Sequence, residues 1–403
     1  MNASLFSENT IADPFPLLNR LREEDPVHWD AGLGTWLVTR HEDVSYLLRH
    51  PELFSSEIYV RDGGLDLPLD AADRPLVDWC ASFRRHEVIQ SDPPHHQRLR
   101  AELRERFSPR YLETHWRDQV RGTVARLLIR VEATGRMDVM HDLAVRLPFI
   151  IITEMLGIPT QDREPLWEQA NNRLASLMSL KADRFRRSAE GIRITSDYLE
   201  HQIDARLECP APDLLGLLTE AERVGRYSRE EVQANAQLLI DAGFVTTIDL
   251  ICNGTLALLR HRDQWELLTA DPSGLSASTT EECLRFDPPV PLSYRIATQD
   301  IELRRRRIAQ GQRVTWAIAA ANRDPRVFPM PDSFDVRRSP NRHLSLGAGI
   351  HFCLGQYLAR MEGQEVFSAL ASRFPALRLA VDVVEYEAVR GVHHLKSLPV
   401  AWD

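Results

Sequence analysis

Cys353 is the residue whose type and setting most directly suggest chemistry, because it stands where a glycine-rich loop, His343–Gly355, is expected to turn into a helix. Gly347 and Gly349 permit positive φ and a close approach of the backbone to a flat ligand, and Gly355 leaves room for a large group beside the first helical turn. Near a helix N-terminus, free N–H groups and the positive end of the helix dipole favour a thiolate over a thiol. A thiolate held in this way is a suitable axial ligand for haem iron.

Residue types alone leave two other roles open for Cys353. An isolated cysteine is more often an ordinary buried residue. A zinc site with His351 is the second, although no further Cys/His pair has zinc-finger spacing.

The arrangement Gly-x-Gly-x-His-x-Cys-x-Gly, from Gly347 to Gly355, is more specific than a lone cysteine. It resembles the cysteine-ligand loop of the cytochrome P450 haem-thiolate monooxygenases. The resemblance implies haem b (iron protoporphyrin IX) with Cys353 as the metal ligand and the loop glycines against the cofactor. Leu346 stands where the family usually has an aromatic residue, which implies weaker shielding of the thiolate.

Haem carries two propionates, which need cationic partners. Four positions match the family's propionate ligands: His96, Arg100, Arg295 and His351. His96 and Arg100 are four residues apart on one helix face, which suits the gripping of one carboxylate. Taken singly, each of the four is more often an ordinary surface charge.

A long apolar helix carries Asp241-Ala-Gly-Phe-Val-Thr-Thr247. The resemblance implies that this is the family's oxygen-binding kink, where Gly243 clears space for dioxygen and Thr246 or Thr247 diverts a backbone bond and shuttles protons. The alternative is a plain apolar helix with back-bonding threonines. Val245 replaces the acid that usually precedes the first threonine, and Asp241, one turn earlier, could substitute for it.

Glu282 and Arg285 lie three residues apart on a helix that ends before Pro288. Such a pair is usually a solvated surface pair. Its position before the proline-rich segment 321–335 resembles the Glu-x-x-Arg helix and meander of the same family, which implies a buried structural clamp behind the cysteine loop. Ser333 stands where the family often has an arginine, which leaves the third partner of the clamp undefined.

The elements that must position these residues are mostly helical, with a smaller β-rich part. We expect a hairpin at residues 27–39, a long irregular segment at 56–90, and a helix from 92 capped by Asp92. A capping box at Ser228 should start the long helix, and short strands should follow Pro289. The resemblance implies one prism-shaped domain over residues 1–403, with β-rich parts near 27–39, 290–318 and 377–403.

Composition narrows the cellular setting. A net charge of -9 and a pI near 5.9 argue against nucleic acid and against an anionic membrane surface. No run of about 18 apolar residues or signal peptide is evident, and five scattered cysteines fit a reducing cytoplasm. We therefore expect a cytoplasmic protein without a membrane span.

Together these features predict a haem-thiolate oxidoreductase of the soluble bacterial type that uses O2 to oxidise a small organic molecule, in keeping with secondary metabolism. The reaction is hydroxylation or, given Val245, coupling, cyclisation or desaturation. No flavin or nucleotide motif is present, so electrons should come from a ferredoxin-type partner. It would dock on an arginine-rich face formed by Arg98, Arg104, Arg106, Arg110 and Arg360.

The substrate, free or bound to a carrier protein, should lie between walls from residues 56–90, 173–187, 244–245, 290–292 and 391–395. The individual candidates are Phe244, Val245, Val290, Leu292, Val392 and His393. The rival interpretations are a haem-binding sensor without turnover and a haem-free helical scaffold.

Overall fold

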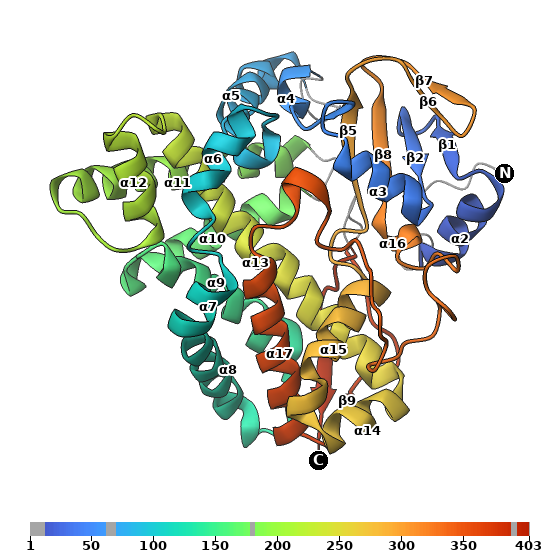
Figure 1. Cartoon of the computed structure of the whole chain (residues 1–403). Coiled ribbons are helices and arrows are strands. Elements are labelled where there is room, and N and C mark those ends of the chain that lie inside the picture. Colours follow the sequence, from blue (N-terminus) through green and yellow to red (C-terminus); the bar gives the residue numbers. More distant parts are fainter. Residues whose placement is uncertain (1–12, 62–69, 178–181, 388–392, 403) are drawn as a thin grey trace.

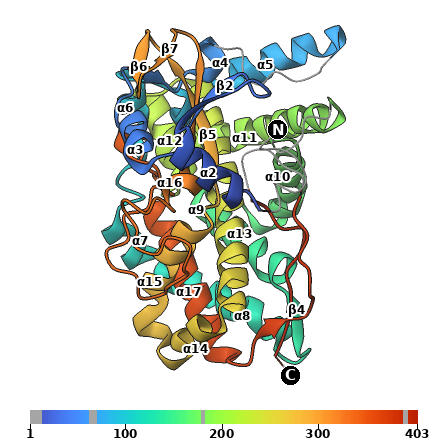
Figure 2. The same cartoon turned by 90° about the vertical axis from the view of Figure 1, so that its right-hand side faces the viewer.

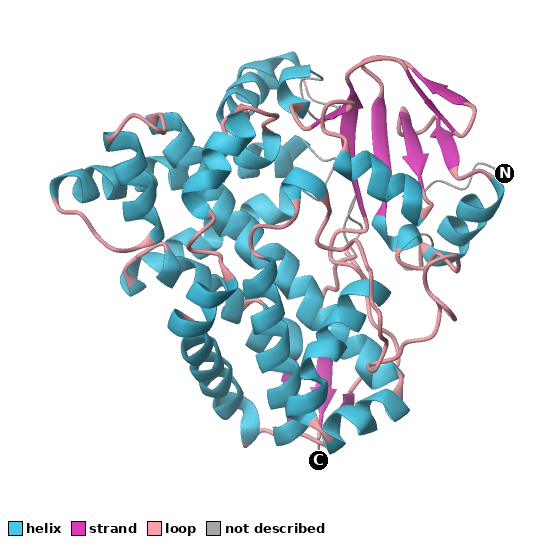
Figure 3. Ribbon diagram, in the orientation of Figure 1, coloured by secondary structure: helices cyan, strands magenta, loops and turns pink. Residues whose placement is uncertain are grey.

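The computed structural model describes residues 13–61, 70–177, 182–387 and 393–402, with the side chains of 174–184 outside the description. The molecule has a triangular outline, in which helices fill most of the volume and a small sheet occupies one corner (Figures 1 and 3). This is the mainly α architecture with a β-rich lobe that the sequence predicted.

The helices of the first half of the chain are α2 (Phe15–Glu24), α3 (His41–Arg49), α4 (Ile58–Arg61), α5 (Arg74–Arg84), α6 (His95–Leu103), α7 (Pro109–His115), α8 (Arg117–Glu132), α9 (Arg146–Met155) and α10 (Arg163–Leu177). Those of the second half are α11 (Ala182–Glu208), α12 (Leu214–Arg223), α13 (Arg229–Arg260), α14 (Arg262–Ala270), α15 (Pro272–Phe286), α16 (Ile318–Ala321) and α17 (Gln356–Arg373). Short 3-10 or π turns lie at residues 71–73, 88–90, 139–144, 160–162 and 349–351.

Helix α13 runs through the centre of the molecule beside α9 and α17 (Figure 2). The predicted capping box is confirmed, because the Ser228 side chain accepts from the Glu231 N–H while Glu231 accepts from the Ser228 N–H. By length and composition α13 could cross a membrane, which we did not expect from the sequence. However, 72% of its most apolar window is buried inside the protein, as in the core helix of a globular fold.

The corner sheet joins distant parts of the chain in the order β1-β2-β8-β5-β3. Its strands are β1 (Val27–Asp30), β2 (Thr35–Val38), β3 (Phe54–Ser55), β5 (Leu292–Ala297) and β8 (Arg313–Ala317). The predicted β1–β2 hairpin is confirmed, with Val27 paired to Val38. β5 pairs antiparallel with β8 and places Arg295 opposite Val314.

Two smaller sheets lie elsewhere in the described part of the chain. One has the order β4-β10-β9, from β4 (Arg136–Asp138), β9 (Arg378–Leu379) and β10 (Pro399–Ala401), and the other is the hairpin of β6 (Ile301–Leu303) and β7 (Arg306–Ile308).

Two expectations about local structure are wrong. Residues 74–84 form the helix α5 rather than irregular chain, because Pro75 occupies its first turn, where a missing N–H costs nothing. Asp92 does not cap α6, whose N-cap is Pro94. Its carboxylate instead accepts from the Ser55 hydroxyl and the Ser56 N–H, at 2.5 and 2.9 Å.

Candidate active site

Backbone contacts on both sides define the cysteine loop. The Cys353 N–H donates to the Leu346 carbonyl at 2.8 Å, and Gly355 is the N-cap of α17. Gly347 and Gly349 have φ of 73° and 69°, as predicted. A Cβ on Gly349 would clash with the Leu48 carbonyl, so that glycine is required by packing against α3. A Cβ on Gly355 would meet nothing within 4 Å, which leaves the expected space beside the helix start.

The protonation of Cys353 differs from the expectation. Burial raises the pKa of the Cys353 thiol, and this outweighs the lowering by the Gly355 N–H, Arg100 and Arg360. The protein groups alone therefore favour the thiol. Deprotonation would follow from metal ligation, because a coordinating thiol loses its proton.

His96, Arg100, Arg295 and His351 gather next to the cysteine. The rings of His96 and His351 lie 4.3 Å apart, and an Nη of Arg100 donates to the Phe352 carbonyl at 2.5 Å. The Ser56 hydroxyl lies 2.8 Å from Nε2 of His351. Arg295 stacks on Trp316 at 4.8 Å. The sequence thus identified four groups that the fold brings together from α6, β5 and the cysteine loop.

This cluster is short of negative charge. Burial, Arg295, His96 and Arg100 lower the pKa of His351 to about 2, and burial with Arg100 lowers that of His96 to about 4. Burial also lowers the pKa of Arg295 to about 10, although Asp92 opposes this. Within the described residues, neither ring nitrogen of the buried His96 has a hydrogen-bond partner. These residues fit a dianionic group such as the two propionates of haem.

The Thr246 hydroxyl on α13 donates to the Ala242 carbonyl at 3.2 Å, and α13 is unbroken from Arg229 to Arg260. This is the back-bonding arrangement that we considered as the alternative to a kink. Thr246 and Ala242 keep exposed surface, whereas Thr247 is buried. A Cβ on Gly243 would lie 2.8 Å from Cγ1 of Ile152. Gly243 therefore lets α9 pack closely and does not clear room for dioxygen through its missing side chain.

Asp241 is held in an ion pair. Nη2 of Arg173 on α10 lies 2.7 Å from its Oδ1, and Arg173 also binds the Thr195 hydroxyl and the Gly191 carbonyl. Val245 is buried in the main core, one turn further along α13. Val245 is thus apolar where the resemblance places an acid, and Asp241, one turn before it, is already paired.

Glu282 and Arg285 are both fully buried, with 2.7 Å between Arg285 Nη2 and Glu282 Oε1. Arg338 is the third member of this cluster, with its Nε 3.1 Å from Glu282 Oε2. Ser333 contributes its backbone carbonyl, which accepts from Arg285 at 3.0 Å. Sequence reasoning missed Arg338, which lies 56 residues from Glu282 and carries no local motif.

The residues proposed as pocket walls differ in burial, and some lie outside the described residues. Phe244 is fully buried and packs on Phe149 of α9 and Trp167 of α10, so its ring belongs to the packing of α13 against these two helices. His393 is also buried, bonded to Asp287 at 2.9 Å and stacked on Tyr386. Their role as pocket-lining residues stays a prediction. Val290 and Leu292 are half-buried. Val392 lies outside the described residues, as do residues 62–69 of the first predicted wall.

One buried acid of interest was not predicted from the sequence. Glu362 of α17 is 1% exposed, and neither of its carboxylate oxygens has a hydrogen-bond partner within the described residues. Burial raises its pKa to about 8, opposed by the neighbouring Thr247 hydroxyl. A glutamate inside an apolar helix face gives no signal of this kind in the sequence.

Comparison with known proteins defines the class. Residues 276–379 match the model of the family described as Cytochrome P450. The polyketide biosynthesis cytochrome P450 PksS of Bacillus subtilis is 34% identical over 96% of both chains. The cytochrome P450 monooxygenase PikC of Streptomyces venezuelae is 34% identical over 100% of this chain and 94% of its own.

A solved structure extends the comparison to the fold. P450BioI, in complex with hexadec-9Z-enoic acid ligated acyl carrier protein, has 30% identity and a TM-score of 0.89 over 98% of this chain and 100% of its own. The chain belongs to the cytochrome P450 family. It is a haem-thiolate oxidoreductase of the bacterial type, and its cofactor is haem with a cysteine thiolate as axial ligand. This excludes the haem-free scaffold and favours an enzyme over a sensor.

Proposed function

We propose that this enzyme takes electrons from a ferredoxin-type protein and oxidises a small organic molecule of secondary metabolism. The observation that carries the proposal is the anion-deficient cluster of His96, Arg100, Arg295 and His351 next to Cys353. The cluster supplies the charges that two propionates need, and Cys353 supplies the thiolate.

Each of these residues has a separate task. Cys353 ligates the iron, and the four cationic or imidazole groups hold the propionates and so fix the cofactor's orientation. When bound, haem supplies reductive activation of O2 and oxidation of an unactivated C–H bond. Thr246, whose hydroxyl donates to the Ala242 carbonyl in this structure, is the residue that we assign to hydrogen bonding on the oxygen side, where its hydroxyl would exchange that partner.

The source of protons is the point at which this chain departs from the usual pattern of its family. Val245 carries no proton, and Asp241 is paired with Arg173. We therefore place the proton source in ordered water or in a polar group of the substrate. If neither delivers protons efficiently, coupling, cyclisation or desaturation competes with hydroxylation.

The relatives suggest the substrate class. PksS is named for polyketide biosynthesis, and P450BioI was solved with an acyl chain carried by acyl carrier protein. A long acyl or polyketide substrate, free or carrier-bound, is the candidate that we favour.

The test is Cys353→Ala, compared with the control Cys209→Ala at an exposed cysteine. The reduced wild type with carbon monoxide should show the red-shifted Soret band of thiolate ligation. That band should persist in the control and vanish in Cys353→Ala. If it survives in Cys353→Ala, Cys353 is not the iron ligand.

A further inference from the structure

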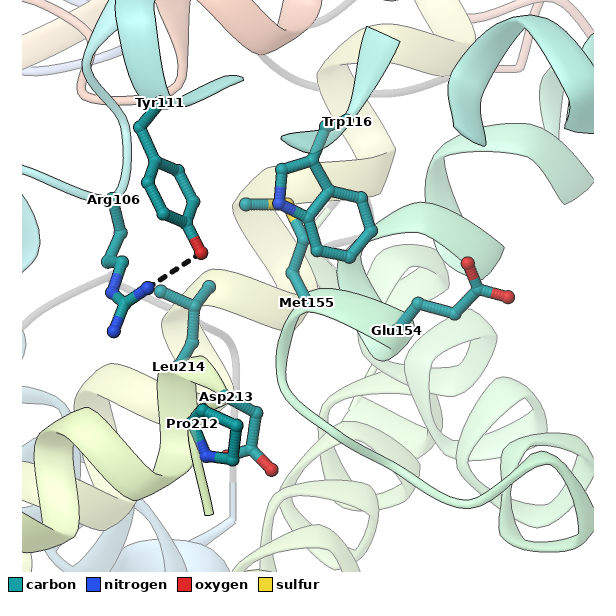
Figure 4. Close-up of a pocket in the computed structure, with 8 residues that line it drawn as sticks. All are labelled: Arg106, Tyr111, Trp116, Glu154, Met155, Pro212, Asp213 and Leu214. Atoms are coloured by element: carbon teal, nitrogen blue, oxygen red, sulfur yellow. Dashed lines mark hydrogen bonds between the residues drawn. The ribbon is translucent and has the colours of Figure 1, made fainter. Parts of the chain in front are cut away.

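A pocket of about 240 Å3 opens between α7, the start of α8, the end of α9 and the start of α12 (Figure 4). None of its residues belongs to the candidate active site. It is lined by Arg106, Tyr111, Trp116, Glu154, Met155, Pro212, Asp213 and Leu214. Because these residues come from four separate elements, the pocket is a product of the tertiary fold.

The two acids in the pocket lining form ion pairs with arginines that lie outside the lining. Glu154 Oε1 lies 3.1 Å from Nη1 of Arg163, and its other oxygen accepts from the Gln119 amide at 2.7 Å. Asp213 lies 2.9 Å from Nη2 of Arg206 and caps α12 by accepting from the Gly216 N–H. Neither acid therefore holds an unbalanced charge towards the pocket.

Arg106 is the unbalanced charge. Its Nη1 donates to the Tyr111 hydroxyl at 2.7 Å, and its guanidinium stacks on the Tyr111 ring at 4.9 Å. Within the described residues it has no acidic partner. The remaining N–H groups of this guanidinium are available to an anion at the mouth of the pocket.

The rest of the lining is largely apolar and aromatic. Tyr111 and Trp116 lie on opposite sides of the opening, with the side chain of Leu214 near Tyr111 and that of Met155 near Trp116 (Figure 4). In this view the indole nitrogen of Trp116 lies on the side nearer Tyr111 and Arg106. The Trp116 N–H has no acceptor within the described residues, so it is a second donor for the same anion.

We propose that this pocket binds a small aromatic carboxylate. The Tyr111 ring is already stacked on His115 at 4.2 Å, so the ligand ring lies against the Trp116 indole, over Met155 and Leu214. Its carboxylate accepts from the Arg106 guanidinium and the Trp116 N–H. An aromatic ring stacks well on such walls, and a carboxylate matches the fork of a guanidinium. The volume admits a bicyclic ring with its carboxylate and excludes a drug-sized ligand.

The probe is 2-naphthoate, titrated calorimetrically into the haem-loaded enzyme. 2-Naphthamide and 2-naphthylmethylamine have the same ring with a neutral and a positive group. Naphthoate should bind at one site, the amide about ten-fold more weakly, and the amine without measurable affinity, since a charge-assisted bond is lost or reversed. Equal binding of the three probes, or no naphthoate binding, would overturn the proposal.

Variants locate the site. Arg106→Gln should weaken naphthoate binding about ten-fold and Trp116→Phe by a smaller factor, because phenylalanine keeps the aromatic wall without the N–H. Arg110→Gln, at an exposed arginine outside the lining, is the matched control and should bind as the wild type does. The Soret band and the carbon monoxide spectrum of each variant verify its fold.

A last experiment tests whether naphthoate binds in this pocket or in the substrate cavity. Saturating 4-phenylimidazole, which ligates haem iron on the distal side, should leave naphthoate affinity unchanged. If 4-phenylimidazole abolishes naphthoate binding, or if Arg106→Gln binds naphthoate as the wild type does, the ligand sits elsewhere and the proposal is wrong.

Discussion

At the scale of single residues, Val245 has the widest consequence for the proposed function, because it leaves no ionisable side chain where the resemblance places an acid. Asp241 cannot simply take its place, since Arg173 binds both of its oxygens. Because the Arg173 guanidinium occupies both carboxylate oxygens, Asp241 would have to give up this ion pair before it could pass on a proton.

This gives a prediction about the ratio of product formed to reducing equivalents consumed. Asp241→Asn should leave the ratio unchanged, while Val245→Asp should raise it and shift products towards hydroxylation. Asp241→Asn also leaves the buried Arg173 without its ion-pair partner, so the melting temperature of this variant should fall. Arg173→Gln is the control for that loss of stability. If Asp241→Asn abolishes turnover while Arg173→Gln does not, Asp241 is the proton relay.

Arg295 gives a prediction about haem retention. It is buried, with its Nη1 on the Tyr294 carbonyl at 3.3 Å and no acidic side chain bonded to it within the described residues. Each charge-assisted bond to a propionate should contribute roughly 1.5–3 kcal/mol.

Arg295→Leu should therefore release haem to apomyoglobin faster than the wild type. Arg307→Leu, at an exposed arginine on β7, should show the wild-type rate. A wild-type rate for Arg295→Leu would remove Arg295 from the cofactor site.

At the scale of elements, the cluster around Glu282 ties α15 to the loop that precedes the cysteine. Arg338 donates to both Glu282 oxygens and to the Ser333 carbonyl, and Asn341 donates to the same carboxylate at 3.1 Å. The Arg338 side chain enters from a position five residues beyond Ser333.

Arg338→Ala should lower the free energy of unfolding by about 3–5 kcal/mol, the usual cost of stranding one partner of a buried ion pair. Arg337→Ala, at the exposed neighbour, should change it little. Chemical denaturation of both variants measures the difference. Equal stabilities would mean that Glu282 is satisfied by its other partners, Arg285 and Asn341, without Arg338.

Between α13 and α17, Glu362 predicts a dependence of stability on pH. Burial raises its pKa from 4.5 to about 8, so between these values the folded protein holds a proton that the unfolded chain has lost. Its contribution to the free energy of unfolding therefore falls as pH rises through this window.

Glu362→Gln keeps the shape of the side chain and removes the titration. The melting temperature of the wild type should drop more between pH 5 and pH 8 than that of Glu362→Gln. Parallel curves for the two proteins would contradict the raised pKa.

The features that could be predicted from the sequence are those with a local signature. The β1–β2 hairpin, the capping box at Ser228 and the positive φ of Gly347 and Gly349 all follow from short-range turn and cap chemistry. Helix α5 was missed because residues 56–90 were expected to be irregular, whereas Pro75 stands in the first turn of α5, where proline is compatible with a helix.

Contacts between distant residues could not be predicted. Ser56 and His351 are 295 residues apart, and nothing in either segment indicates the other. The same holds for Arg173 and Asp241, whose pairing removes a candidate proton relay. The resemblance located the groups around Cys353, but their partners and protonation depend on packing.

At the scale of the whole molecule, the net charge is -9, but several arginines are concentrated near the cysteine. The predicted arginine face is partly neutralised, since Arg98 pairs with Glu231 and Arg360 with Glu281. Arg104 and Arg110 are exposed and have no ion pair within the described residues. Arg104 lies one turn beyond Arg100, which contacts the carbonyl next to Cys353.

These two arginines therefore carry the last prediction, that an acidic ferredoxin docks beside the cysteine loop. Exposed charges attract over about 10 Å at 0.1 M salt and less above it, so the rate of the first electron transfer should fall steeply with ionic strength. Arg104→Gln with Arg110→Gln should lower the rate at low salt and flatten its salt dependence, because the charges that steer the encounter are gone. Arg305→Gln with Arg307→Gln removes two positive charges from the β6–β7 hairpin and should leave both quantities unchanged. Stopped-flow reduction under carbon monoxide measures them. A rate independent of salt in the wild type, or equal slopes in the two double variants, would place electron entry on another face.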